Sequence, residues 1–211
     1  MIYLCLDVGN VLCRFDIDLI VDEISKTFNV SRAEGLYFIN KVQKHQDLGL
    51  INFRDELREH FDIKSEVILD RLIAVWNQCI YPESHILDKM IDLKHNFSIE
   101  TAILSNMGTE HKNYLEVSLA SAYKKFIFED SVTHFSCDVG ARKPSLIYYQ
   151  SFLQQYPQFK GAVYVDDLHE NLQSSEKFGF RTFHFDLNKN DNLNTRSAEL
   201  VSAIVSSAAN P

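Results

Sequence analysis

Polar residues follow three short apolar runs of this sequence at the points where those runs end. Asp7 follows YLCL, Ser105 follows AIL, and the pair Asp166 and Asp167 follows VYV. Lys143 lies in GARKPS, directly before a proline that suits the first turn of a helix. Ligands of open parallel sheets bind beyond the carboxyl ends of the strands. If these runs form such a sheet, the five side chains meet at one edge of it.

Together, these residue types can carry out phosphoryl transfer. Carboxylates held close together repel one another unless a cation joins them, and oxygen ligands without histidine or cysteine favour Mg²⁺. Lys143 and Ser105 supply a positive charge and a hydroxyl donor for an anionic group. The backbone amides of Asn106 and Met107, near a helix start, would add donors. Asp7, kept ionised by Mg²⁺ and Lys143, is then the expected nucleophile of an aspartyl-phosphate mechanism.

The elements that must position these residues are predicted to form an α/β fold. Short runs rich in β-forming residues alternate with stretches of helical period, which favours a doubly wound, Rossmann-like parallel sheet with helices on both faces. The predicted strands are Ile2–Leu6, Thr101–Leu104, Val132–Phe135, Ala162–Val165 and Arg181–Phe185.

The interval between the first two predicted strands differs because its pattern is almost entirely helical. Ile20, Val21 and Ile24 belong to one amphipathic stripe, and SRAE at residues 31–34 is a capping box before the next helix. We therefore predict an α/β core domain of residues 1–15 and 82–211. A helical-bundle cap of residues 16–81 is inserted after the first strand.

Composition and charge limit the expected partners. The chain has 211 residues, of which 45% are hydrophobic and 24% charged, as in ordinary globular proteins. Its net charge of -8 repels nucleic acids and anionic membranes, so neither is an expected partner. The four cysteines lack C-x-x-C spacing, and the start of the chain lacks the features of a signal peptide. Both observations predict a cytoplasmic protein with reduced thiols.

Four segments, taken in order, resemble the four motifs of the haloacid dehalogenase (HAD) superfamily, in its phosphatase branch. LCLDVGNVL resembles the first motif, AILSN the second, GARKP the third and VYVDDLHEN the fourth, in its Asp-Asp form. Each motif is weak alone, but four in order, with a helical insert between the first and second, form a specific signal. The resemblance implies that the insert is a C1 cap, a mobile lid that closes over the substrate and excludes water.

The resemblance also implies the roles of individual residues. The implied catalytic residues are Asp7, Ser105 and Lys143, and the implied phosphate-binding residues are Ser105, Asn106 and Lys143. The implied Mg²⁺ ligands are the Asp7 side chain, the Gly9 backbone carbonyl and the Asp166 side chain, with Asp167 beside the metal or in its outer shell. Asn171 is expected to have a supporting role.

Gly9 is the main departure from the family pattern. Most HAD phosphatases have an aspartate at this position, which protonates the leaving group and later activates water, and such catalysis typically contributes ~10²–10⁴ in rate. The Asp-x-Gly-Asn pattern resembles a subgroup that includes bacterial α-D-glucose-1-phosphate phosphatase, whose leaving group needs less protonation. Asp16, His45 or Asp47 of the predicted cap are alternative proton donors.

The sequence leaves three functions open. The main prediction is a Mg²⁺-dependent hydrolase of a small phosphorylated metabolite, with a sugar phosphate as one candidate substrate. The first alternative is a metal-independent haloacid dehalogenase, because that branch also lacks the second aspartate. The second is a catalytically weak HAD domain that binds a phosphorylated ligand or a partner.

Overall fold

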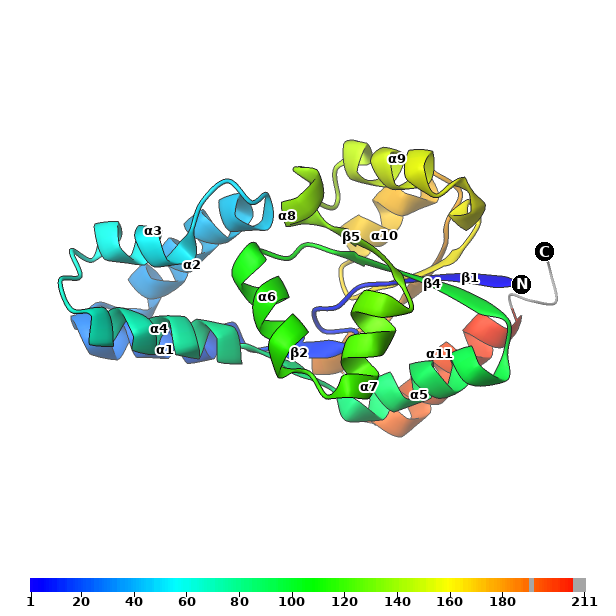
Figure 1. The fold of residues 1–211 in the computed structure, drawn as a ribbon, viewed down its shortest axis with the longest axis horizontal. Helices are drawn as coiled ribbons and strands as arrows, with labels where there is room; N and C mark the ends of the chain where they lie inside the picture. Colours follow the sequence, from blue (N-terminus) through cyan, green and yellow to red (C-terminus); the bar gives the residue numbers. More distant parts are fainter. Residues whose placement is uncertain (190–191, 207–211) are drawn as a thin grey trace.

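A five-stranded parallel sheet with strand order β5-β4-β1-β6-β7 lies at the centre of the core in this computed structural model (Figure 1), which describes residues 1–189 and 192–206. The strands are β1 (Ile2–Leu6), β4 (Ile99–Ser105), β5 (Val132–Phe135), β6 (Val163–Asp166) and β7 (Arg181–His184). Leu6 of β1 pairs with Ile103 on one side and Val165 on the other. The end of β1 therefore lies between the ends of β4 and β6.

The predicted strands agree with the observed ones except at their ends. β1 and β5 have the predicted bounds, whereas β4 and β6 extend to Ser105 and Asp166. These two polar residues stay in the sheet because Ser105 pairs with Phe135 and Asp166 pairs with His184. The predicted doubly wound α/β fold is confirmed.

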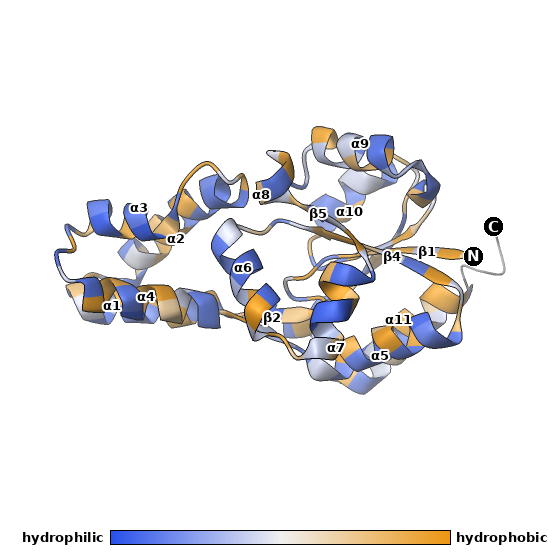
Figure 2. Ribbon diagram, viewed as in Figure 1, coloured by the Kyte–Doolittle hydropathy of each residue, from blue (hydrophilic) through white to orange (hydrophobic). Residues whose placement is uncertain are grey.

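Helices cover both faces of the sheet, so the strands are buried on both sides. One face carries α5 (Ser84–Asn96) and α11 (Leu193–Ser206), and the other carries α9 (Leu146–Gln155) and α10 (His169–Glu176). Each face has its own apolar core. The other α-helices described in the core are α6 (Thr109–Ser118), α7 (Ser121–Lys124) and α8 (Ser136–Val139). Figure 2 shows hydrophobic residues along the central strands and mixed hydrophobic and hydrophilic residues on the helices.

Four helices form a separate unit beside the sheet, at the left of Figure 1. We call α1 (Ile17–Phe28), α2 (Arg32–Asp47), α3 (Phe53–His60) and α4 (Glu66–Gln78) the helical unit. It has a hydrophobic core of its own, centred on side chains such as Trp76. The predicted capping box is confirmed, because the Ser31 hydroxyl accepts from the Glu34 N–H at 3.2 Å and the Glu34 carboxylate accepts from the Ser31 N–H at 2.8 Å.

A two-stranded ribbon joins the helical unit to the core. β2 (Cys13–Phe15) leads into the helical unit and β3 (Ile80–Pro82) leads out of it, and the two strands pair in antiparallel fashion. The sequence pattern did not indicate this ribbon, because each strand has only three residues. None of the described helices has the length and apolar character required to cross a membrane.

Candidate active site

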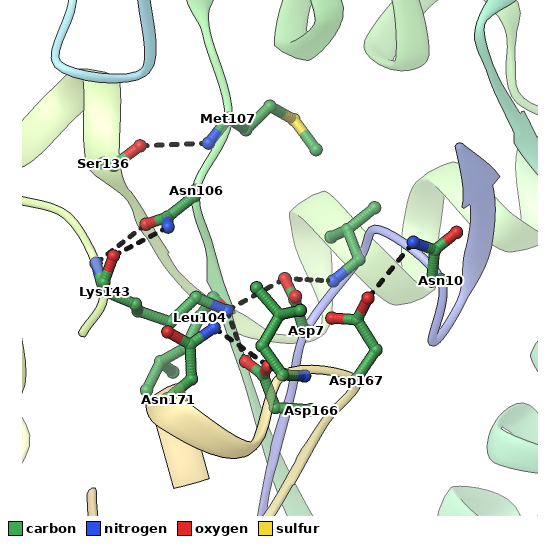
Figure 3. Close-up of polar contacts among 12 residues, drawn as sticks. Asp7, Asn10, Leu104, Asn106, Met107, Ser136, Lys143, Asp166, Asp167 and Asn171 are labelled. Carbon is green, nitrogen blue, oxygen red and sulfur yellow. Dashed lines mark hydrogen bonds and ion pairs between the residues drawn. The ribbon is translucent and has the colours of Figure 1, made fainter. Parts of the chain in front are cut away.

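The predicted site residues meet where the central strands end (Figure 3). Asp7 comes directly after β1, while Ser105 and Asp166 are the last residues of the flanking strands β4 and β6. Lys143 reaches the same edge from the loop before α9. All four side chains are buried. The carboxyl-end rule therefore brings together residues that are far apart in the sequence.

The Lys143 ammonium group joins two of the carboxylates. Its Nζ lies 2.7 Å from Asp166 Oδ2 and 3.0 Å from Asp7 Oδ1, and it donates to the Leu104 carbonyl at 2.8 Å. These three contacts use the three donors of an ammonium group. Burial opposes the charge of Lys143, but the nearby Asp166 and Asp7 outweigh it and raise the pKa of Lys143. The lysine therefore stays charged and orients Asp7.

Asp166 has its full complement of hydrogen bonds. Its Oδ2 accepts from Lys143 and from the Tyr164 hydroxyl, and its Oδ1 accepts from the Leu168 N–H and the Asn171 Nδ2, both at 2.9 Å. A carboxylate has about four acceptor positions in all. Asp166 is also fully buried and does not line the cavity described below. Asn171 thus has a visible supporting contact, with Asp166.

The Asp7 carboxylate accepts fewer hydrogen bonds than that of Asp166. Its Oδ1 accepts from the Val8 N–H at 2.7 Å and lies beside Lys143. The pKa of Asp7 is raised to about 6, chiefly by burial and also by the charge of Asp166, against the lowering effects of Lys143 and Ser105. The Asp7 side chain lines the cavity. A positioned, partly accessible carboxylate beside a cation is suited to act as a nucleophile.

Asp167 is held by a residue that the motif comparison did not single out. Asn10 Nδ2 donates to Asp167 Oδ2 at 3.1 Å, and Asn10 Oδ1 accepts from the Phe15 N–H at 3.1 Å. Asn10 has a φ of 54°, in the left-handed region that asparagine tolerates better than most residues. Burial, then Asp7 and Asp166, raise the pKa of Asp167 to about 7. The Gly-Asn pair that follows Asp7 and Val8 was the sequence signal available for this contact.

The residues after β4, which the sequence predicts to bind phosphate, make hydrogen bonds within the chain. The Met107 N–H, which the sequence suggested as a phosphate donor, donates instead to Ser136 Oγ at 2.9 Å. The Asn106 side chain accepts from the Lys143 N–H at 2.8 Å and donates to the Lys143 carbonyl at 3.0 Å (Figure 3). Asn106 therefore positions the lysine loop, and Ser105 is left as the hydroxyl beside Asp7.

A cavity lies over these residues, and the helical unit forms its other wall. Asp47 and Gln43 of α2 and Trp76 of α4 line it opposite Asp7. The helical unit is held there by contacts with α6, because Glu110 accepts from the Phe53 N–H at 2.9 Å and from Gln46 Nε2 at 2.8 Å. The cavity is thus closed by residues from two parts of the fold.

The donor set suits Mg²⁺. Asp7, Asp166 and Asp167 each place a carboxylate oxygen within 4.8 Å of those of the other two. All three groups offer hard oxygen atoms, which Mg²⁺ prefers. Burial, followed by the charges of the neighbouring acids, raises the pKa values of Asp7 and Asp167, and a bound cation would favour their charged forms. The residues present therefore fit this metal.

Comparison with known proteins supports the fold. No protein-family model matches the sequence, and no curated protein matches it significantly. A HAD family enzyme from Bacteroides thetaiotaomicron, in complex with magnesium and inorganic phosphate, is 22% identical with a TM-score of 0.75, covering 91% of this chain and 98% of that one.

Two further structures are similar at lower scores. A predicted HAD-like family hydrolase from Porphyromonas gingivalis is 17% identical with a TM-score of 0.65, covering 95% of this chain and 98% of that one. A dehalogenase is 16% identical with a TM-score of 0.65, covering 96% of each chain. The chain therefore has the fold of HAD family enzymes, and that fold is shared by a magnesium- and phosphate-bound enzyme and by a dehalogenase.

Proposed function

We propose that this protein is a HAD superfamily hydrolase, a Mg²⁺-dependent phosphatase that acts on a phosphomonoester of a small metabolite. The observation that carries the proposal is the environment of Asp7. Its carboxylate faces the cavity with Lys143 at 3.0 Å and Ser105 beside it, in a cluster of three acids. A dehalogenase has no use for such an acidic cluster, whereas a phosphatase needs it to hold a metal.

The metal ligands follow from the hydrogen bonds already in place. We assign them to Asp7, the Gly9 carbonyl and Asp167, all of which belong to residues that line the cavity. Asp166 has no acceptor position left, so its role is to hold Lys143. When bound, Mg²⁺ would supply the positive charge that neutralises the acids and stabilises the phosphoryl oxygens.

The chain's own residues then perform substitution at phosphorus. A carboxylate oxygen of Asp7 attacks phosphorus, the bond from phosphorus to the ester oxygen breaks, and an aspartyl-phosphate forms. Ser105 donates a hydrogen bond to the phosphoryl group, while Lys143 keeps Asp7 ionised and oriented. Water attacks the same phosphorus in the second step, which restores the Asp7 carboxylate and releases inorganic phosphate.

We propose that the helical unit is the cap of this enzyme. It supplies one wall of the cavity, so it can exclude water and contact the leaving group. Its cavity residues include charged, amide and aromatic side chains, a mixture suited to a small polar alcohol such as a sugar. The proposed partner is therefore a small phosphorylated metabolite.

The test is a hydrolysis screen of phosphate esters with excess Mg²⁺ or with EDTA. Wild type, Asp7→Asn and the control Asp92→Asn, an exposed acid on α5, are compared. We expect phosphate release that requires Mg²⁺ and Asp7 and is unchanged in Asp92→Asn. Phosphate release that survives both EDTA and Asp7→Asn contradicts the mechanism. Chloride release from a haloacid without metal would establish the dehalogenase instead.

A further inference from the structure

The cavity has room where the usual proton donor is missing. A Cβ atom built on Gly9 meets no atom within 4 Å, and Gly9 has no positive φ that would exclude a side chain. Nothing in the local backbone therefore requires a glycine. The proton that the leaving group needs must come from another wall of the cavity.

Asp47 is an acid on the opposite wall. It is the last residue of α2, it lines the cavity together with Asp7, and it is only 4% exposed. Its Oδ2 accepts from Arg142 Nη2 at 3.1 Å. Its Oδ1 makes no hydrogen bond to the described residues, so one oxygen is held while the other is free to exchange a proton.

The environment of Asp47 suits a group that both gives and takes a proton. Burial is the main effect on its pKa, and together with the charge of Asp7 it outweighs Arg142 and Lys143, so the pKa rises to about 6. A catalytic acid and base works best when its pKa lies near the operating pH. The ion pair with Arg142 fixes the position of the carboxylate without removing its ability to be protonated.

The other titratable residues of the cavity are less suitable. Asp7 is the nucleophile, Asp167 faces the acid cluster, and Lys143 is held by two carboxylates. His111 has a ring nitrogen 2.8 Å from the Trp76 carbonyl, and burial lowers its pKa to about 4, so it is neutral at physiological pH.

The two other cap residues suggested by the sequence do not line this cavity. The Asp16 carboxylate accepts from the Asp18 N–H at 3.1 Å and caps α1. His45 is exposed, with Nδ1 3.3 Å from the Lys41 carbonyl. Of the three cap residues that the sequence suggested as proton donors, Asp47 therefore lines the cavity and the other two do not.

Two buried donors on residues that line the cavity have no partner in the described chain. They are Arg142 Nε and Trp76 Nε1, and both residues line the cavity. A buried N–H without an acceptor is costly, so these donors are expected to bind acceptor oxygens of a ligand. The cavity therefore offers donors to a leaving group that carries oxygen atoms.

From these contacts we propose that Asp47 is the general acid and base of the reaction, replacing the aspartate that Gly9 lacks; this rests on the proposed phosphatase function. As Asp7 attacks phosphorus, the bond to the ester oxygen breaks and the proton on Asp47 moves to that oxygen, which leaves as an alcohol. The Asp47 carboxylate then takes a proton from the water that attacks the aspartyl-phosphate. The bond between phosphorus and the Asp7 oxygen breaks, which frees the Asp7 carboxylate and leaves Asp47 protonated again.

The test compares Asp47→Asn with wild type on p-nitrophenyl phosphate and phenyl phosphate in the presence of Mg²⁺. Loss of a general acid matters little for p-nitrophenolate, a weak base, and much more for phenolate. We expect kcat/KM to fall by ~10²–10⁴ for phenyl phosphate and by less than about 10-fold for p-nitrophenyl phosphate. Because water activation is also lost, p-nitrophenol should appear as a burst of one equivalent per enzyme, with phosphate trapped on the protein after acid quenching.

Further variants test whether the effect is specific to Asp47. Asp16→Asn and His45→Gln should leave both substrates unchanged. Gly9→Asp should restore phenyl phosphate hydrolysis in the Asp47→Asn background, because the space beside Gly9 is open. Asp47→Ser replaces Asp47→Asn if the latter does not melt cooperatively near wild type.

The possible failures are distinguishable. If wild type hydrolyses neither ester with Mg²⁺, the proposed function is contradicted. If wild type hydrolyses both and Asp47→Asn lowers both by the same factor, or by none, Asp47 is not the acid and base although the phosphatase assignment stands.

Discussion

Replacing Lys143 by methionine should destabilise the protein strongly. The substitution keeps most of the apolar stem but removes an ammonium group that lies 2.7 Å from Asp166 and 3.0 Å from Asp7. The acid cluster is then left without a cation, and breaking a buried ion pair in this way costs about 3–5 kcal/mol. In a protein of this size each kcal/mol lowers Tm by about 2–4 °C, so we expect a fall of roughly 6–20 °C.

Thermal and urea denaturation in EDTA at neutral pH measure this loss. Without Lys143, the pKa values of Asp7 and Asp167, already raised to about 6 and about 7, rise further above those of the unfolded chain. The destabilisation is therefore largest above those pKa values and declines as the pH falls through them. Excess Mg²⁺ should also recover part of the stability, because it supplies a replacement cation.

A lysine pair near the surface provides the control for this experiment. Lys112 pairs with Asp138 at 2.7 Å but is a quarter exposed, so Lys112→Met should cost less than about 1 kcal/mol. A Lys143→Met protein that is as stable as Lys112→Met in EDTA would refute the reasoning. So would a large loss that neither Mg²⁺ nor acidification reduces.

Two further predictions concern the metal and the pH. In a thermal-shift assay, Asp167→Asn should remove most of the rise in Tm that Mg²⁺ causes. Asp166→Asn should lower the Tm measured without metal but keep the rise that Mg²⁺ causes. The reverse pattern would make Asp166 the metal ligand instead of Asp167. Burial lowers the pKa of His111 to about 4, below the value of about 6.5 in the unfolded chain. The folded protein therefore loses stability as the pH falls from about 6.5 towards 4, because the unfolded chain binds the proton first. The loss amounts to up to about 3 kcal/mol. His111→Gln should therefore flatten the acid limb of a stability curve from urea denaturation, and an unchanged limb would contradict the assignment.

The parallel core was predictable because its signals are local. Strands buried on both faces appear as apolar runs, and the carboxyl-end rule then places the residues that follow them at one edge. For this reason the sequence predicted that four residues lie close together: Asp7, Ser105, Lys143 and Asp166. The different roles proposed for Asp166 and Asp167 were not predictable, because they follow from hydrogen bonds such as that from the Tyr164 hydroxyl to Asp166.

The other wall of the cavity could not be derived from the sequence. Asp47 is an acid at the end of an amphipathic helix, where such residues are usually solvated. Its burial depends on how the helical unit packs against α6 and on the distant Arg142. The unpartnered N–H of Trp76 is equally invisible, since the stripe to which Trp76 belongs indicates only a core position.

The β2–β3 ribbon makes the helical unit exchangeable. Phe15 and Ile80 are paired neighbours, so the chain leaves the sheet domain and returns to it at nearly the same point. A segment of any length or shape can be attached between two such adjacent ends without altering the distance that the core must span. If the proposed function holds, the residues that attack phosphorus and the wall that contacts the alcohol lie in separate units and can diverge separately. A different helical segment inserted between Phe15 and Ile80 would then face the same Asp7.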